Sequence, residues 1–90
     1  MALSDSAKKA KQAEIARRLA AIETQYTLVK AKRKAYRAFA KQTKQNLKGK
    51  PVSAQITTNN ILNSKKQDIY RANQRLLSMR ADLAKFRKQS

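Results

Sequence analysis

The sequence predicts an all-α protein made of two long helices that fold back on each other as an antiparallel, coiled-coil-like hairpin. Three observations predict it. The chain holds one glycine and one proline, and both lie in the segment Gly49-Lys50-Pro51. Residues that favour helix, mainly alanine, lysine, arginine, glutamine and leucine, dominate the rest. Apolar residues recur at steps of three and four on both sides of the break, as in helices that pack along a seam.

The first helix is expected over residues 5–48. Ser4 or Ser6 is a suitable N-cap, and Asp5 would complement the helix dipole in the first turn. Gly49 followed by Pro51 is a strong stop signal. The expected seam steps by four and three through Ile15, Leu19, Ile22, Tyr26 and Val29. The same phase then continues through Arg33, Tyr36, Ala40, Thr43 and Leu47.

Residues 49–60 are expected to form an ordered loop that packs Val52 and Ile56 against the end of the first helix. Helix-capping residues follow at 57–60, and Ser64 with Gln67 would form a second possible capping box. The second helix is therefore expected over residues 61–88. Its seam consists of Leu62, Ile69, Leu76, Met79, Leu83 and Phe86, with Lys65 and Ala72 at the two remaining positions.

The whole chain, residues 1–90, is expected to be one small domain with a thin core. Folded back at the loop, the second helix would place Leu76 opposite Val29, to within a turn. It would cover the first helix from Lys48 back to about Ala20, so that the preceding residues would project as an overhang.

The most informative feature of the sequence is a row of six basic residues. Their spacing of four and three places them on one helix face, in a line roughly 27 Å long. We call this set the basic row: Lys30, Lys34, Arg37, Lys41, Lys44 and Lys48. No Asp or Glu occurs between Thr24 and Gln67. Because like charges at this spacing repel by about 0.2–0.5 kcal/mol per pair, the row is expected to face a polyanion.

A second basic cluster lies on the expected overhang and has two interpretations. It consists of Lys8, Lys9, Lys11, Arg17 and Arg18. It is either a basic arm that becomes ordered on a polyanion or a helical stretch in which Glu14 pairs with Arg17 and Arg18. On the second helix, the basic residues Arg71, Arg75, Lys85 and Lys88 are expected to form a solvated face, with Asp68 paired to Arg71 and Asp82 to Lys85.

The five aromatic residues are expected to pack in or beside the seam rather than to stack on nucleic-acid bases. They are Tyr26, Tyr36, Phe39, Tyr70 and Phe86. Phe39 and Tyr70 lie at the seam margins and are therefore the two best candidates for a different role.

Composition points to a binding protein rather than a catalyst. The 22 Lys and Arg residues against five acids give a net charge of +17, which favours a polyanionic partner, most commonly nucleic acid. The chain lacks Cys and His, and its acids are scattered, so we expect no enzyme activity, cofactor, metal or small-molecule substrate. Without a long apolar run or a signal peptide, we expect an intracellular protein, or one inside a virus particle, that is neither secreted nor transmembrane.

Two short stretches of the first helix resemble a ribosomal family. Ser6-Ala-Lys-Lys and Gln12-Ala-Glu-Ile-Ala-Arg17 are similar to the N-terminal helix of the small helical protein of the bacterial small ribosomal subunit named by number twenty. That resemblance implies a three-helix bundle on ribosomal RNA. The long first helix and the loop at Pro51 depart from that layout, and no residue role is carried over.

The sequence as a whole predicts a non-catalytic structural component of a nucleoprotein assembly, such as a phage or other virus particle or a ribosome-like complex. The basic row and the second basic cluster would bind the backbone of DNA or RNA without sequence preference, beside other protein subunits. The alternative is a coiled-coil interaction protein that uses its seam to oligomerise, or that docks on an acidic protein surface. A membrane is a less suitable partner, since membrane-lying helices expose a broad apolar face.

Overall fold

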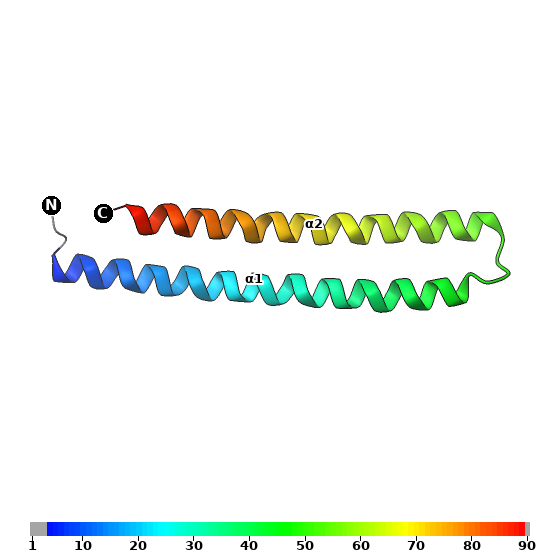
Figure 1. Ribbon diagram of the computed structural model, residues 1–90, viewed down its shortest axis with the longest axis horizontal. Helices are drawn as coiled ribbons and strands as arrows, with labels where there is room; N and C mark the ends of the chain where they lie inside the picture. Colours follow the sequence, from blue (N-terminus) through cyan, green and yellow to red (C-terminus); the bar gives the residue numbers. More distant parts are fainter. Residues whose placement is uncertain (1–3, 90) are drawn as a thin grey trace.

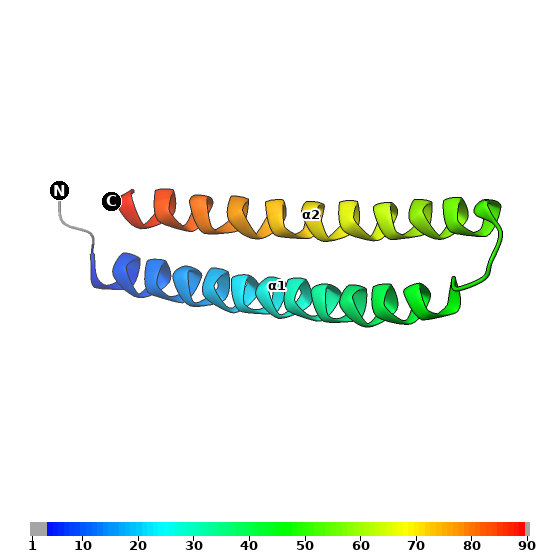
Figure 2. The same cartoon turned by 45° about the vertical axis from the view of Figure 1, so that its right-hand side comes forward.

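The computed structural model describes residues 4–89, and this part of the chain forms two helices. Helix α1 spans Asp5–Asn46, and helix α2 spans Val52–Lys88. The helices run antiparallel and lie side by side along nearly their whole length, as both ribbon views show (Figures 1 and 2). The molecule is a straight rod with extents of 70 × 16 × 11 Å. This architecture confirms the predicted all-α hairpin.

Helix α1 begins and ends close to where the sequence predicts. The Ser4 side chain accepts a hydrogen bond from the backbone N–H of Ala7 at 3.2 Å and so caps the first turn. Gly49 has a φ of 77°, in the left-handed region that costs glycine least. The N–H of Lys50 then donates to the carbonyl oxygen of Leu47 at 3.0 Å, which closes the turn.

Helix α2 begins nine residues earlier than the sequence suggests, so the prediction of a loop over residues 49–60 was wrong. Pro51, with φ −66° and ψ 161°, is the N-cap, and its carbonyl oxygen accepts from the N–H of Ala54 and Gln55. Nothing after it stops the helix, since residues 52–64 contain no Gly, Pro or charge and each added residue gains a backbone hydrogen bond. The expected caps at 57–60 and 64 lie inside the helix, and Val52 and Ile56 are exposed.

The buried core is a narrow strip between the two helices. Val29 packs with Ala72 and Leu76, and Ile22 packs against them. Leu83 is also buried, and the other predicted seam residues of α2, namely Leu62, Ile69, Met79 and Phe86, are half-buried. The predicted seam of α2 and the predicted facing of Val29 and Leu76 are therefore confirmed. Lys65 is exposed, and its Nζ lies 4.8 Å from the centre of the Phe39 ring, so it covers that ring from outside.

The predicted seam of α1 was right at every seventh residue from Ile15 and wrong at Leu19, Tyr26 and Arg33, which are exposed. Toward the loop, the predicted seam residues Ala40, Thr43 and Leu47 are half-buried. Ile15, Ile22 and Val29 face α2, as does Tyr36. Leu19 and Tyr26 lie at the margin and are 44% and 41% exposed. Between Ile15, Ile22, Val29, Tyr36 and Thr43, the residues that contact α2 lie one position before the predicted ones. They are Arg18, Gln25, Lys32 and Phe39, and all four are half-buried.

Three of these four positions hold long polar side chains, because each finds a partner there. The Gln25 side-chain amide donates to the backbone carbonyl oxygen of Ala72 at 2.9 Å. The Lys32 ammonium pairs with the Asp68 carboxylate across the interface. The guanidinium carbon of Arg18 lies 4.4 Å from the centre of the Phe86 ring. Their aliphatic stems cover the seam while their polar ends are satisfied, so hydrophobicity alone selects the wrong residues.

The predicted overhang is much shorter than expected. Because α2 contains 37 residues, it reaches back along α1 past Arg18 to Lys11. The Lys11 ammonium donates to the carbonyl oxygen of Arg87 at 3.4 Å. Among the described residues of α1, only the first turns project beyond α2, as Figure 1 shows at the dark-blue end.

Two adjacent leucines test this seam. Leu76 is 2% exposed and Leu77 is 47% exposed, while both lie in the middle of the same helix. Leu76→Ala should lower the free energy of unfolding by about 2–4 kcal/mol because it leaves a cavity, whereas Leu77→Ala should cost less than about 1 kcal/mol. Urea unfolding followed by circular dichroism at 222 nm measures both. Because the change in helix propensity is the same, equal losses would show that the seam is placed wrongly.

Candidate nucleic-acid interface

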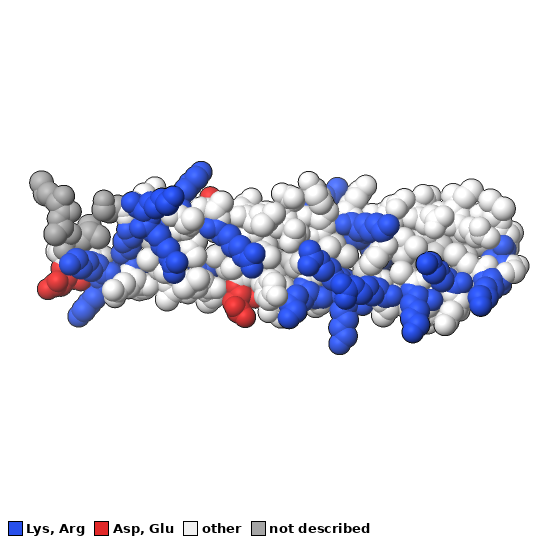
Figure 3. Space-filling view, viewed as in Figure 1, with Lys and Arg blue, Asp and Glu red and all other residues white. Residues whose placement is uncertain are grey.

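All six residues of the basic row are exposed; five lie on α1, and Lys48 lies in the turn that follows it. They occur between the seam positions of the helix, on the side turned away from α2. In the space-filling view, basic atoms line the half of α1 that runs toward the loop (Figure 3). Within the described residues, none of the six takes part in an ion pair. The row therefore presents its full positive charge to solvent.

The hairpin holds the row straight without using it for packing. The observed seam of α1 differs in phase from the predicted one. It places the five row residues within α1 on the outermost part of the helix, farther from α2 than predicted. The row begins one residue after buried Val29 and continues to the turn at Gly49. Packing on α2 thus stiffens this half of α1, and no row residue gives up a charge to do so.

The loop-side half of the hairpin has one basic edge and one neutral edge. Residues 51–64, which begin α2, contain no charged residue. Figure 3 shows this half of α2 as largely white beside the blue atoms of α1. The positive charge of this half is therefore concentrated on its α1 edge.

Four further cations lie on one flank of the hairpin and were not singled out from the sequence. Each follows a seam residue by four positions: Arg33 on α1 and Lys66, Arg80 and Arg87 on α2. The Arg80 guanidinium lies 5.8 Å from the centre of the Tyr26 ring, which shows that these positions of the two helices share a flank. Arg33 had been placed in the seam, and it is exposed. The sequence would have indicated this flank if the seam of α1 had been assigned correctly, because each of the four cations follows a true seam residue by four positions.

Four of the five aromatic rings carry a cation within 6.0 Å of the ring centre. Lys30 and Arg80 lie near Tyr26, Lys66 near Tyr36, Lys65 near Phe39, and both Lys11 and Arg18 near Phe86. Tyr70 differs, since it is 64% exposed and, within residues 4–89, no cation covers its ring. The prediction that Tyr70 packs in or beside the core was wrong.

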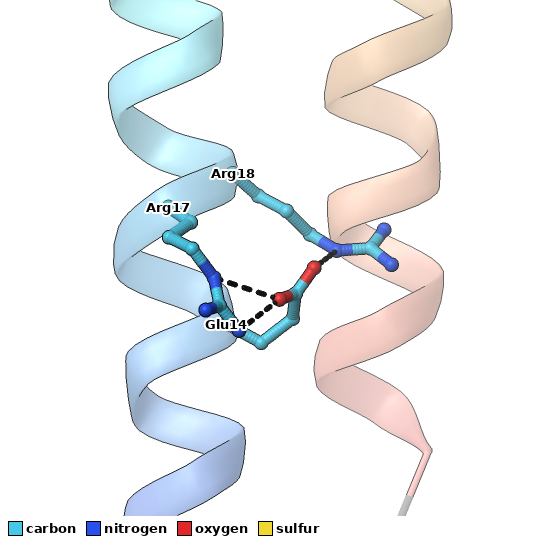
Figure 4. A network of polar contacts seen from close by, with 3 residues as sticks. All are labelled: Glu14, Arg17 and Arg18. Carbon is cyan, nitrogen blue, oxygen red and sulfur yellow. Dashed lines mark hydrogen bonds and ion pairs between the residues drawn. The ribbon is translucent and has the colours of Figure 1, made fainter.

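In the second basic cluster, Glu14 pairs with Arg17 and Arg18 (Figure 4). One Glu14 carboxylate oxygen accepts from Arg17 at 2.6 and 3.0 Å, and the other accepts from Arg18 at 3.1 Å. Lys11 and Arg18 also reach α2, at Arg87 and Phe86. Lys8 and Lys9 are exposed near the start of α1. The ion-paired helix is thus the interpretation that the structure shows, and Lys11 and Arg18 belong to the hairpin rather than to a free arm.

The outer face of α2 is solvated, but its predicted ion pairs do not form. Asp68 pairs with Lys32 of α1 instead of Arg71. Among the described residues, the structure has no ion pair between Asp82 and Lys85. Within residues 4–89, no group of three His, Cys, Asp or Glu side chains is placed to hold a metal ion. Neither helix, over the same residues, combines the length and apolar character needed to cross a membrane.

The Glu14 cluster predicts a pH dependence. Hydrogen bonds from Arg17 and then Arg18 hold the pKa of Glu14 below its ordinary value. A lowered pKa stabilises the folded state above the ordinary value of 4.5, and this contribution is lost as the pH falls through the lowered pKa. Carbon-13 NMR titration of the side-chain carboxyl should show the lowered pKa, and Arg17→Gln should raise it more than Arg18→Gln. An unchanged pKa in both variants would contradict the pairing.

Comparison with known proteins yields no relative. No protein-family model matches this chain, and no curated protein or solved structure is significantly similar to it. The helical hairpin and the distribution of its charges are therefore what a functional proposal can use.

Proposed function

We propose that this protein is a non-catalytic structural component of a nucleoprotein assembly and that it binds the backbone of DNA or RNA. The observation that carries the proposal is the basic row, six exposed cations along one face of α1 and into the turn after it, with no ion pair to an acid among the described residues. Holding these charges together costs free energy in the isolated protein. A phosphate backbone offsets that cost, because its condensed counterions are released when the row binds.

The row suits nucleic acid better than an anionic membrane. The exposed large apolar residues of α1, among those described, are Leu19, Tyr26 and Leu28, and all three precede the row. This half of α1 therefore has little apolar surface to insert among lipid chains, which an interfacial helix requires. Phosphate contacts need only the positive charge and its spacing.

Binding by the row is proposed to be independent of base sequence. Five of the six residues are lysines, which contact phosphate as flexible point charges rather than as a fixed fork. The remaining one, Arg37, stands between lysines on the same face. A protein of this kind positions or compacts nucleic acid, beside other protein subunits, in a virus particle or a ribosome-like complex.

Neutralising part of the row tests the proposal. Lys34→Gln, Lys41→Gln and Lys48→Gln together should weaken binding to a duplex of mixed sequence. Six phosphate contacts give a slope of about −5 for log K against log [salt], and three fewer contacts should bring it to roughly −3. Fluorescence anisotropy over a series of salt concentrations measures both quantities. A change of the duplex sequence at constant length should leave the affinity unchanged.

A matched variant separates the row from total charge. Arg71→Gln, Arg75→Gln and Lys85→Gln also remove three exposed cations, but from α2. This variant should keep most of the affinity and nearly the full salt slope. If it loses as much as the row variant, the attraction depends only on net charge. If the wild-type protein shows no salt-dependent binding to duplex or single strand, the proposed function is wrong.

Tyr70 allows a separate prediction for single strands. Its uncovered ring lies one helical turn after Lys66, so a strand held by cations on that flank can stack an unpaired base on it. Tyr70→Ala should weaken binding to single-stranded DNA or RNA by about 1–3 kcal/mol, while binding to duplex should change little. Tyr70→Phe, which keeps the ring, should restore the single-strand affinity. Equal losses in both variants, or on both substrates, would show that the ring does not stack.

A further inference from the structure

The other half of the hairpin carries a groove between the two helices that the basic row does not use. Its apolar lining comes from Leu19 and Ile22 of α1 and from Leu83 and Ala84 of α2. Arg80, Arg87 and Lys88 line it on the α2 side, and no acidic residue is among its described lining residues. The groove therefore combines an apolar floor with a basic rim.

Exposed apolar residues extend this surface along both helices. On α1, Tyr26 follows Leu19 by seven residues, and on α2, Ala84 follows Leu77 by seven. Leu19, Tyr26 and Leu77 are all large apolar residues left exposed in the hairpin. A spacing of seven residues is about 10 Å along a helix, which matches the repeat of a third helix packed against the other two.

We infer that this groove is a docking site for an amphipathic helix of another protein, one with an apolar stripe flanked by acidic residues. The apolar stripe would cover Leu19, Leu83 and their neighbours, and the acidic flank would pair with Arg80 and Arg87. Desolvated by the bound helix, these charge pairs would select an acidic partner over a neutral one. The inference concerns a different surface from the basic row and does not rest on nucleic-acid binding.

A second copy of this chain is a poorer occupant. It would bring its own Arg80, Arg87 and Lys88 to a rim that is already basic, and each chain has a net charge of +17. A bilayer is also a poorer occupant, because a groove between two helices fits a rod better than a flat surface.

A synthetic peptide tests the inference with the full-length protein. The probe is a helix of about 21 residues with leucine at the seam positions and glutamate on both flanks, which keeps it from pairing with itself. A control peptide carries glutamine in place of leucine and so measures plain electrostatic attraction to a basic protein. The leucine peptide should bind at least about tenfold more tightly than the control in fluorescence anisotropy at physiological salt.

Variants of the protein then locate the peptide. Leu19→Gln and the pair Arg80→Gln with Arg87→Gln should each weaken binding of the leucine peptide by about tenfold. These side chains are exposed or lie at the rim, so the helix signal and unfolding midpoint should stay close to those of the wild type. The row variant Lys34→Gln, Lys41→Gln, Lys48→Gln should keep the peptide affinity within about threefold, because its changes lie in the other half.

Three outcomes would overturn the inference. The first is a row variant that loses as much peptide affinity as the groove variants, which would mean that the peptide binds to charge alone. The second is self-association of the wild-type chain that Leu19→Gln abolishes, seen by analytical ultracentrifugation, which would make a second copy the occupant. The third is displacement of the bound peptide by phosphatidylserine vesicles from both the wild-type protein and the row variant, which would make a bilayer the occupant of the groove.

Discussion

The hairpin depends on one narrow contact, the packing of Val29 against Ala72 and Leu76. The small side chain of Ala72 allows the helices to approach closely enough for the Gln25 amide to reach its backbone carbonyl oxygen, at 2.9 Å. Few other residues are buried, so this strip supplies much of the apolar stabilisation of a chain near the size at which domains become marginal. Because this strip fixes which side of each helix is buried, it also fixes which residues are exposed.

Repulsion among the many positive charges disfavours the packing of the two helices, and several contacts in the structure reduce it. Lys32 pairs with Asp68, and several cations lie over aromatic rings at the interface, so these charges support the packing of the helices. Glu14 does the same for Arg17 and Arg18 on α1. Among the described residues, no member of the basic row pairs with an acid, and of the six only Lys30 lies near an aromatic ring, 5.2 Å from the centre of Tyr26. The row is directed away from α2. Repulsion is thus concentrated on one outer edge, which is where the proposed polyanion would relieve it.

The two proposed binding surfaces lie in different halves of the rod. The row occupies the half of α1 near the loop, while the groove lies near the other end, between Leu19 and Leu83. On these proposals, one chain can hold a nucleic-acid backbone with one half and a protein helix with the other. The separation also lets the two proposals be tested independently, since Lys34, Lys41 and Lys48 do not line the groove.

Helix content, the break at Gly49-Lys50-Pro51 and the basic row are all properties of the sequence alone. Local spacing and backbone chemistry decide them, because residues three or four apart share a face in any helix and only glycine takes a φ of 77° at little cost. The seam of α2 was equally evident, since its apolar residues have no competitors nearby. The start of α2 was not, because Val52 to Ile56 suit a strand, a loop or a helix on local grounds.

Tertiary structure decided the phase of the seam in α1 and everything that depends on it. By hydrophobicity Leu19 outranks Arg18 and Tyr26 outranks Gln25, yet the seam contains Arg18 and Gln25. Arg18 lies on the Phe86 ring, and Gln25 bonds to Ala72, 47 residues away along the chain. The spacing of residues within α1 does not predict which partners α2 supplies, such as the Phe86 ring and the Ala72 carbonyl oxygen. Because the seam of α1 contains Arg18 and Gln25, Arg33 lies at the surface, and Leu19 and Tyr26 are exposed. The basic flank and the groove therefore depend on how the two helices pack, and the sequence of α1 alone does not predict them.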